Sequence, residues 1–299
     1  MHFASDSKPD KLYKYVSAEG AGHILRDGKL RCSSPVLFND PFDGQIEAAR
    51  EFSKQQVDDY VAKRVMAFAV AGSQIPPEAS EVFKYRYEQF KQQLATGKSS
   101  EDALKEDAWS RRLTEALAEP SQPRDPIKWS KIQRDFRVCT FSETPESISM
   151  WSHYADHHRG ACLEFSARPD GLVKCARKVS YIRDLPKFAS LEEWGDFLLG
   201  LGELDWSRLV EEYLLRKNPE WAYEREWRIL FPKPSSDDLH YYRPFSEAEL
   251  TAVYLGIRMR DVDRFVLQSL CAGKYSTAEI KRAARSKKQF CIEFLDLEE

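Results

Sequence analysis

The sequence has no long hydrophobic run, and its positive and negative charges nearly cancel. No apolar stretch approaches the roughly 18 to 20 residues that a transmembrane helix requires, so we expect no membrane partner. The segment 1–11 is polar and lacks the apolar core of a secretion signal, which predicts a cytoplasmic location. A net charge of -3 over 299 residues excludes a broadly basic nucleic-acid-binding protein and is typical of a soluble globular chain.

The sequence also lacks a recognisable metal or disulfide pattern. Its 6 cysteines are scattered without any C-x-x-C pair, which predicts buried reduced thiols. His153 and His157 are spaced to share one face of a helix, as two metal ligands do. The residues between them do not form the H-E-x-x-H motif, and no third ligand follows at a suitable spacing. We therefore predict no metal site.

Strand and helix patterns alternate along the chain. The predicted strands are 12–16, 29–35, 137–142, 161–165, 179–182, 221–231, 251–256 and 289–295. The predicted helices outside the middle segment are a turn through Ala21, Ile24 and Leu25 that ends at Asp27-Gly28, and the segments 145–155, 191–216, 262–270 and 277–286. From about Ser53 to Leu117 apolar residues recur at helical spacing, and a loop with Pro120, Pro123 and Pro126 follows. This order predicts an α+β fold, with a single catalytic domain over residues 1–299 and a helical insertion at residues 53–130.

The most informative segment contains two carboxylates, Glu224 and Glu226, in a predicted strand. Alternate side chains of a strand share a face, so both acids would point the same way. Such a pair must repel, share a proton or be held for chemistry. Three large aromatic residues flank the pair, namely Trp221, Tyr223 and Trp227. The segment is therefore a candidate site, and the alternative is a structural ion pair with Arg225, Arg228 or a distant lysine.

Three further segments mix aromatic and polar side chains, as pockets for planar ligands do. They contain Tyr13, Lys14 and Tyr15; Ser33, Ser34 and Asn39; and Trp151, His153 and Tyr154. The aromatic residues of the first and third segments have an ordinary alternative, which is packing on a core. The segment Asn39-Asp-Pro41 has the alternative of an Asx-type turn. The basic runs 174–183 and 281–288 are either solvated surfaces or phosphate-binding patches.

Four short blocks of the sequence resemble an uncharacterised bacterial domain family. The blocks are Leu12-Tyr-Lys-Tyr15, Ser33-Ser-Pro35 with Phe38-Asn-Asp-Pro-Phe-Asp43, Met150-Trp-Ser-His-Tyr-Ala155, and Tyr223-Glu-Arg-Glu-Trp-Arg228. Together they span most of the chain outside the helical segment. This resemblance implies no activity.

A second resemblance is to the ADP-ribosyltransferase superfamily. It rests on an aromatic first strand, a serine-bearing second strand and a late strand with Glu-x-Glu, and it implies a central, mostly antiparallel split sheet with NAD as substrate. In this resemblance Glu226 is the catalytic acid and Glu224 directs the substrate. The side chains implied in NAD binding are Tyr13, Lys14, Tyr15, Ser33, Ser34, Asn39, Trp151, His153 and Tyr154. The sequence departs from the superfamily at Lys14, where a histidine or arginine is usual, and in having a Ser-Ser pair instead of Ser-Thr-Ser.

The expected function is transfer of ADP-ribose from NAD to a macromolecular acceptor, either a protein or a nucleic acid. Glu226 would stabilise the oxocarbenium-like transition state. A bacterial toxin or antiviral defence role, with an inhibitory or antitoxin partner, would fit such an activity. Two alternatives stay open: a nuclease or other hydrolase that uses Glu224 and Glu226 with or without a metal, and a non-catalytic ligand-binding module.

Overall fold

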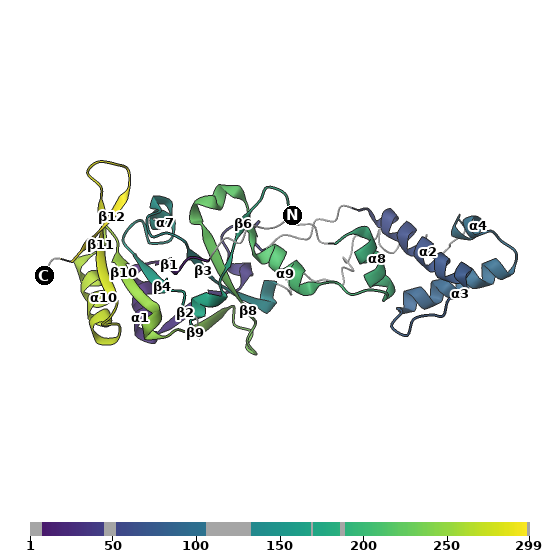
Figure 1. Ribbon diagram of the computed structural model, residues 1–299, viewed down its shortest axis with the longest axis horizontal. Coiled ribbons are helices and arrows are strands. Elements are labelled where there is room, and N and C mark those ends of the chain that lie inside the picture. Colours follow the sequence, from purple (N-terminus) through teal and green to yellow (C-terminus); the bar gives the residue numbers. More distant parts are fainter. Residues whose placement is uncertain (1–7, 45–51, 106–132, 169, 186–188, 298–299) are drawn as a thin grey trace. The chain divides into compact units, whose positions relative to one another are not determined.

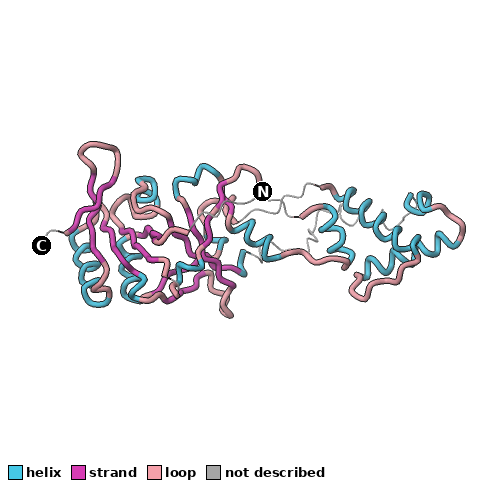
Figure 2. Tube along the Cα trace, viewed as in Figure 1, coloured by secondary structure: helices cyan, strands magenta, loops and turns pink. Residues whose placement is uncertain are grey.

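The computed structural model describes residues 8–44, 52–105, 133–168, 170–185 and 189–297 (Figure 1). The chain divides into two compact units. The first comprises Met1–Ile46, Ser130–Arg183 and Tyr213–Glu299, and the second comprises Glu47–Trp129 and Asp184–Glu212. Strands lie in the first unit, whereas the described secondary structure of the second unit is helical (Figure 2).

The first unit is built on a 10-stranded sheet, and a separate 2-stranded sheet lies beside it in the same unit. The strands of the large sheet are β1 (Lys11–Val16), β2 (Lys29–Ser33), β3 (Phe136–Ser142), β4 (Ala161–Ser166), β5 (Arg177–Lys178), β8 (Glu226–Pro232), β9 (His240–Pro244), β10 (Leu250–Leu255), β11 (Glu279–Arg285) and β12 (Ile292–Asp296). The small sheet pairs β6 (Ser180–Tyr181) with β7 (Arg216–Lys217). The predicted α+β class with a mostly antiparallel sheet is confirmed, because only the β10–β11 pair of the large sheet is parallel.

Strand β3 is the point where the large sheet branches. It pairs with β8 along its whole length, from Phe136 opposite Pro232 to Ser142 opposite Glu226. Its other edge meets β1 only at Ser142 and β2 only at Val138. The strand order runs β12-β11-β10-β4-β1-β3-β2-β9, with β8 and β5 branching from β3. Glu226 therefore lies beside the end of β3 that is nearest to β1.

The main core of the first unit lies between the sheet and two helices, α1 (Ala18–Asp27) and α10 (Asp261–Lys274), which pack against each other. Helix α1 begins at Ser17, whose side chain accepts from the amide of Gly20. It ends at Gly28, which adopts the left-handed conformation that glycine tolerates best (φ 62°). The shorter helices of this unit are η1 (Pro35–Leu37), α7 (Ile148–His153), η2 (Leu172–Cys175), η3 (Pro219–Glu224) and η4 (Glu247–Glu249).

The second unit has its own hydrophobic core, formed by helices from both of its segments. These helices are α2 (Lys54–Ala71), α3 (Glu81–Ala95), α4 (Ser100–Lys105) and α8 (Leu191–Leu199), and a further helix, α9, spans Trp206–Leu214. Ser53 and Gln56 form a capping box at the start of α2. Helices occur as predicted in residues 53–105, while the predicted insertion from residue 106 to 130 lies outside the described residues.

Three sequence predictions of local structure are wrong. The predicted helix 277–286 is instead occupied by strand β11 (Glu279–Arg285), because pairing with β10 and β12 overrides the helical tendency of alanine and lysine. Residues 221–231 are not one strand: η3 ends at Glu224, and Arg225 (φ 45°) turns the chain into β8. His157 does not continue the helix of His153, because it has a positive φ of 53°. Strand β9 has no counterpart among the predicted elements.

Candidate functional site

Five charged side chains meet in the interior of the first unit. We call them the charge cluster: Asp43, Lys217, Glu224, Glu226 and Arg228. Each is less than 10% exposed, although ionised groups are seldom buried unless they are paired. Three carboxylates therefore face two cations in a space that water scarcely reaches.

Local backbone geometry explains how the acids meet without sharing a strand. Pro219 opens η3 behind Asn218, whose side chain accepts from the amide of Glu220 and caps the turn. The left-handed Arg225 then separates Glu224 from β8. On β8 the alternation of side chains places Glu226 and Arg228 on the same face. The sequence predicted that Glu224 and Glu226 converge because they share a strand. They converge instead on the ammonium group of Lys217.

Arg228 is the most completely bonded member of the charge cluster. Its Nη1 and Nη2 donate to the two oxygens of Asp43 at 2.7 and 2.6 Å. Its Nε and Nη2 donate to the two oxygens of Glu226 at 2.8 Å each. Nη1 also donates to the Leu214 carbonyl at 2.8 Å, so all the N–H groups of the guanidinium are used. Both paired carboxylates are held in the bidentate manner that arginine favours.

Lys217 connects all three carboxylates. Its Nζ lies 2.6 Å from Glu224, 3.2 Å from Glu226 and 3.4 Å from Asp43. Burial alone would lower the pKa of Lys217, but the attraction of the surrounding carboxylates outweighs it and raises that pKa above its ordinary value. Lys217 therefore stays charged.

The two glutamates have opposite electrostatic environments. Burial tends to raise the pKa of Glu226, yet the attraction of Arg228 and Lys217 outweighs burial and lowers the pKa to about 2. For Glu224, burial and the neighbouring Glu226 carboxylate raise the pKa, and Lys217 offsets them only in part. Glu226 is thus a fixed anion, whereas Glu224 is the acid that binds a proton more readily than usual.

Partly exposed aromatic side chains cover the charge cluster. We call Tyr154, Tyr181, Trp221 and Tyr223 the aromatic rim. The Tyr154 hydroxyl donates to Glu224 at 2.6 Å, and the amide of Glu226 donates to the Tyr181 hydroxyl at 2.8 Å. The Trp221 ring lies 5.0 Å from Nζ of Lys217.

The rim continues outward to His153. The Nδ1 atom of this exposed histidine lies 3.0 Å from the hydroxyl of Tyr223. A path of polar and aromatic groups therefore leads from solvent to Glu224.

Several predicted binding residues meet in the hydrophobic cluster that supports the rim. Tyr15 and Trp151 are buried in it, with their rings 5.5 Å apart and nearly perpendicular. Their polar atoms are already bonded, the Tyr15 hydroxyl to the Thr144 carbonyl and the Trp151 indole to the Pro145 carbonyl. Both residues therefore position α7 instead of facing a ligand. The alternative of core packing describes their contacts.

Tyr13 lies on the same face of β1 as Tyr15 but reaches a different group. Its ring packs 6.2 Å from that of Tyr254, whose hydroxyl donates to the buried Glu164 at 2.6 Å. Lys14 points to the other face, where its Nζ donates to the carbonyl and hydroxyl oxygens of Thr140 at 2.8 and 3.1 Å.

The serine segment does not reach the charge cluster. Ser33 bonds to His240 of β9 at 3.3 Å, and the buried Ser34 donates to the Gln133 carbonyl. Ser33 pairs with Val138, which lies four residues along β3 from Ser142, the partner of Glu226. At about 3.3 Å per residue this separation is roughly 13 Å along the strand. Asn39 is exposed.

The turn after Asn39 nevertheless contributes to the site. The amide of Phe42 donates to the Asp40 side chain at 2.9 Å, which is the Asx-type turn that the sequence predicted. This turn places Asp43 on Arg228. Asp43, Lys217 and Tyr181 are the site residues that the sequence prediction missed. Asp43 ends the block Phe38-Asn-Asp-Pro-Phe-Asp43, but neither Lys217 nor Tyr181 lies in a recognisable motif.

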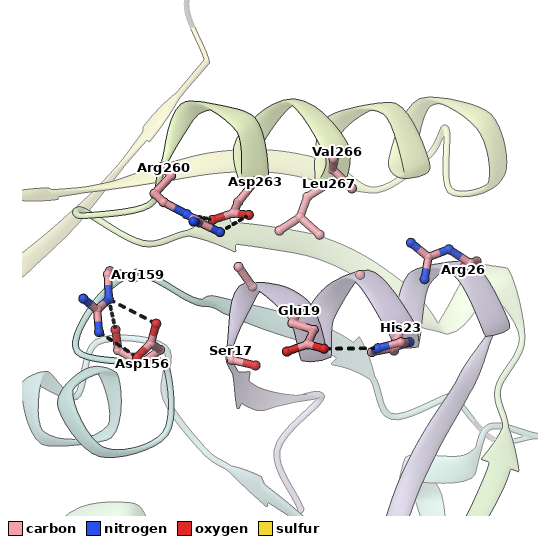
Figure 3. A pocket seen from close by; sticks show the side chains of 12 residues that line it. Ser17, Glu19, His23, Arg26, Asp156, Arg159, Arg260, Asp263, Val266 and Leu267 are labelled. Carbon is pink, nitrogen blue, oxygen red and sulfur yellow. Dashed lines mark hydrogen bonds and ion pairs between the residues drawn. The ribbon is translucent and has the colours of Figure 1, made fainter.

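A separate pocket of about 610 Å³ lies between α1 and α10 (Figure 3). None of the predicted site residues lines it. Three of its charged or titratable pairs are local: Arg159 with Asp156, Arg260 with Asp263, and His23 with Glu19. This pocket therefore does not belong to the charge cluster.

Two features are absent from the described residues, a metal-ligand cluster and a membrane-spanning helix. No group of three or more histidine, cysteine, aspartate or glutamate side chains there has a geometry that could hold a metal ion. None of the described helices has the length and apolar character needed to span a membrane.

The charge cluster and its rim fall largely within one stretch of the chain. Residues 150–229 match the family described as "Protein of unknown function (DUF2971)". This confirms the expected resemblance to an uncharacterised domain family. The DUF2971 match contains the whole aromatic rim and every member of the charge cluster except Asp43. No curated protein and no solved structure matches the chain.

Proposed function

We propose that this protein is an ADP-ribosyltransferase that uses NAD and modifies a macromolecular acceptor at the charge cluster. The observation that carries the proposal is the charge balance of the cluster: three buried carboxylates face only two cations. The raised pKa of Glu224 marks it as the carboxylate that is least well compensated. Such a site favours positive charge, and positive charge develops on the ribose when a nicotinamide–ribose bond breaks.

The surrounding residues fit a nicotinamide nucleotide. The aromatic rim offers partly exposed rings that suit a planar heterocycle. Arg225 is exposed, has no carboxylate partner among the described residues, and lies between the two acids in sequence, so it would hold a diphosphate. NAD would supply the activated ribose, with nicotinamide leaving with the bonding electron pair. The acceptor would then bond to ribose C1 and release a proton.

The structure favours an exchange of roles between the two glutamates. Glu226 is already neutralised by Arg228 and Lys217, so its charge would act less strongly on a new cation. Glu224 shares Lys217, and among the described residues its carboxylate otherwise accepts only from the neutral hydroxyl of Tyr154. We therefore assign stabilisation of the oxocarbenium-like transition state to Glu224. Glu226 would anchor the cluster.

A non-catalytic ligand-binding role is the second candidate, and one observation favours it. Every member of the charge cluster is bonded to another member, as in a purely structural ion-pair network. A hydrolase that uses a divalent cation is less well supported, because Lys217 and Arg228 already occupy the acids.

The test measures nicotinamide release and transfer of labelled ADP-ribose by the purified protein, with lysate protein, RNA and DNA fractions as acceptors. We expect activity in the wild type and at least a 100-fold loss in Glu224→Gln. Glu220→Gln is the matched control, because Glu220 is exposed on the same η3 turn. Near-ultraviolet circular dichroism checks that each variant is folded. Absence of nicotinamide release and of labelled product in the wild type would refute the proposal.

A further inference from the structure

The hairpin of β11 and β12 carries a pocket that the charge cluster does not use. A loop of residues 286–291 joins the two strands, which are yellow in Figure 1. The pocket, of about 770 Å³, is lined by this loop together with Ile148 of α7, His158, and Ile257 and Arg258 after β10. We call it the hairpin pocket.

The charge of the hairpin pocket has a single sign. Four cationic side chains line it, namely Arg258, Arg285, Lys287 and Lys288, and no aspartate or glutamate does. None of the four has a carboxylate partner among the described residues, and all are exposed. The pocket of Figure 3 is different, since the carboxylates beside Arg159 and Arg260 pair with them. Unpaired cations that converge on a concave surface attract an anionic ligand.

An aromatic ring stands at the tip of the same hairpin. Phe290 is fully exposed, at 104% of its reference area. Isolated apolar residues on a surface are common, but this ring adjoins the cations and the isoleucines Ile148, Ile257 and Ile292 in one pocket. A fully exposed ring beside phosphate-binding cations is the arrangement that proteins use to stack an unpaired base.

Helix α7 links the hairpin pocket to the charge cluster. Ile148 at its start lines the pocket, and Tyr154, which follows its last residue, donates to Glu224. At about 1.5 Å per residue, the six steps from Ile148 to Tyr154 correspond to roughly 9 Å along the helix axis. A chain bound at the hairpin pocket would thus lie within a few nucleotides of the charge cluster.

We propose that the hairpin pocket binds single-stranded nucleic acid, with its cations on the phosphates and Phe290 stacked on a base. A concave pocket suits a base better than it suits a membrane surface, for which a broader apolar face would be expected. Binding by this surface is independent of catalysis. The additional inference that the bound nucleic acid is the acceptor of ADP-ribose rests on the proposed function.

The experiment is fluorescence anisotropy with a labelled 20-nucleotide oligo(dT) and the equivalent oligo(U), without NAD, over a series of salt concentrations. We expect the affinity of the wild type to fall steeply with salt, with a slope of about -0.7 for each phosphate contacted. Lys287→Glu with Lys288→Glu should weaken binding by more than 10-fold and lower this slope. Phe290→Ala should weaken binding by about 10-fold with the slope unchanged.

The matched control is Lys54→Glu with Lys63→Glu, which changes the net charge equally on exposed lysines of the second unit. This control should bind as the wild type does. The inference is overturned if the wild type fails to bind either strand, or if the hairpin variants bind as well as the control. Binding to vesicles containing phosphatidylserine but not to oligonucleotides would also overturn it, in favour of a membrane surface.

The binding result and the catalytic result are separable. Nicotinamide release without oligonucleotide binding would overturn this inference and keep the proposed function. Oligonucleotide binding without nicotinamide release would keep this inference and overturn the proposed function. Label transferred from NAD to the bound strand, and lost in Lys287→Glu with Lys288→Glu, would support both.

Discussion

Replacing Arg228 by methionine gives the sharpest test of what holds the first unit together. The guanidinium is fully buried, bonds to Asp43 and Glu226 through both oxygens of each, and also contacts the Leu214 carbonyl. Methionine is unbranched, like the aliphatic part of arginine, but it is shorter and apolar, so it leaves these acceptors without donors. Lys217 would then be the single cation facing three carboxylates.

The expected loss of stability follows from the cost of stranded charges. Removing one partner of a buried ion pair typically costs about 3 to 5 kcal/mol. Arg228 is paired with two carboxylates, so we expect a loss at the upper end of that range. The free energy of unfolding of the first unit should decrease by about 5 kcal/mol. Further replacement with Asp43→Asn and Glu226→Gln removes the stranded charges. This triple variant should recover about half of the loss.

The assay is urea unfolding followed by hydrogen–deuterium exchange of peptides that cover β3 and β8. Exchange is needed because the chain has two compact units and tryptophans in both, so total fluorescence mixes their transitions. Arg225→Met is the control, because Arg225 is an exposed arginine three residues before Arg228. It should change stability by less than about 0.5 kcal/mol.

Two outcomes would contradict this reasoning. If Arg228→Met lost no more stability than Arg225→Met, the charge cluster would contribute nothing to the fold. If the triple variant were less stable than Arg228→Met alone, the penalty would come from lost packing and not from unpaired charge.

Three further predictions concern single residues. Gly160→Ala should destabilise the first unit by about 2 kcal/mol in urea unfolding, because an added Cβ would lie 2.1 Å from the Val16 carbonyl oxygen. The control is Gly22→Ala, which should be neutral or stabilising because no atom lies within 4 Å of its added Cβ. Tyr154→Phe should cost about 1.5 to 3 kcal/mol by removing the donor to Glu224, and an unchanged unfolding midpoint would show that this hydrogen bond does not contribute. The pKa of Glu226 is lowered to about 2 from an ordinary 4.5, so its contribution to stability is present above pH 4.5 and is lost as the pH falls toward 2. Acid titration by circular dichroism should therefore show a shallower decline over that window for Glu226→Gln than for the wild type.

The sequence predicted the elements whose signals are local. The periodicity of α10 and the apolar runs of β4 and β10 identify them without reference to the rest of the chain. The local sequence of strand β11 predicts a helix, because Lys281-Arg-Ala-Ala-Arg285 consists of good helix formers. Its neighbours β10 and β12 decide its conformation, and pairing between distant segments is not visible in a local pattern.

The candidate site was predictable where its residues lay close together in sequence. Glu224, Glu226 and Arg228 fall within five residues, and flanking aromatic side chains marked them. Lys217 was not predictable, because a single lysine on a two-residue strand has no distinguishing pattern. Its role arises from the pairing of β7 with β6 and from the turn that follows it.

The charge balance also explains why the two acids need different partners. If Arg228 were shared equally by Glu224 and Glu226, both pKa values would fall and neither acid would respond to a ligand. The bidentate pairing of Arg228 with Glu226 instead concentrates compensation on one acid, and Glu224 keeps one ammonium and one hydroxyl. Positive charge that arrives beside Glu224 is therefore stabilised more than it would be beside Glu226. The alternation of side chains along β8 places Glu226 beside the guanidinium of Arg228. This asymmetry makes Glu224 the acid through which the charge cluster would act on a ligand.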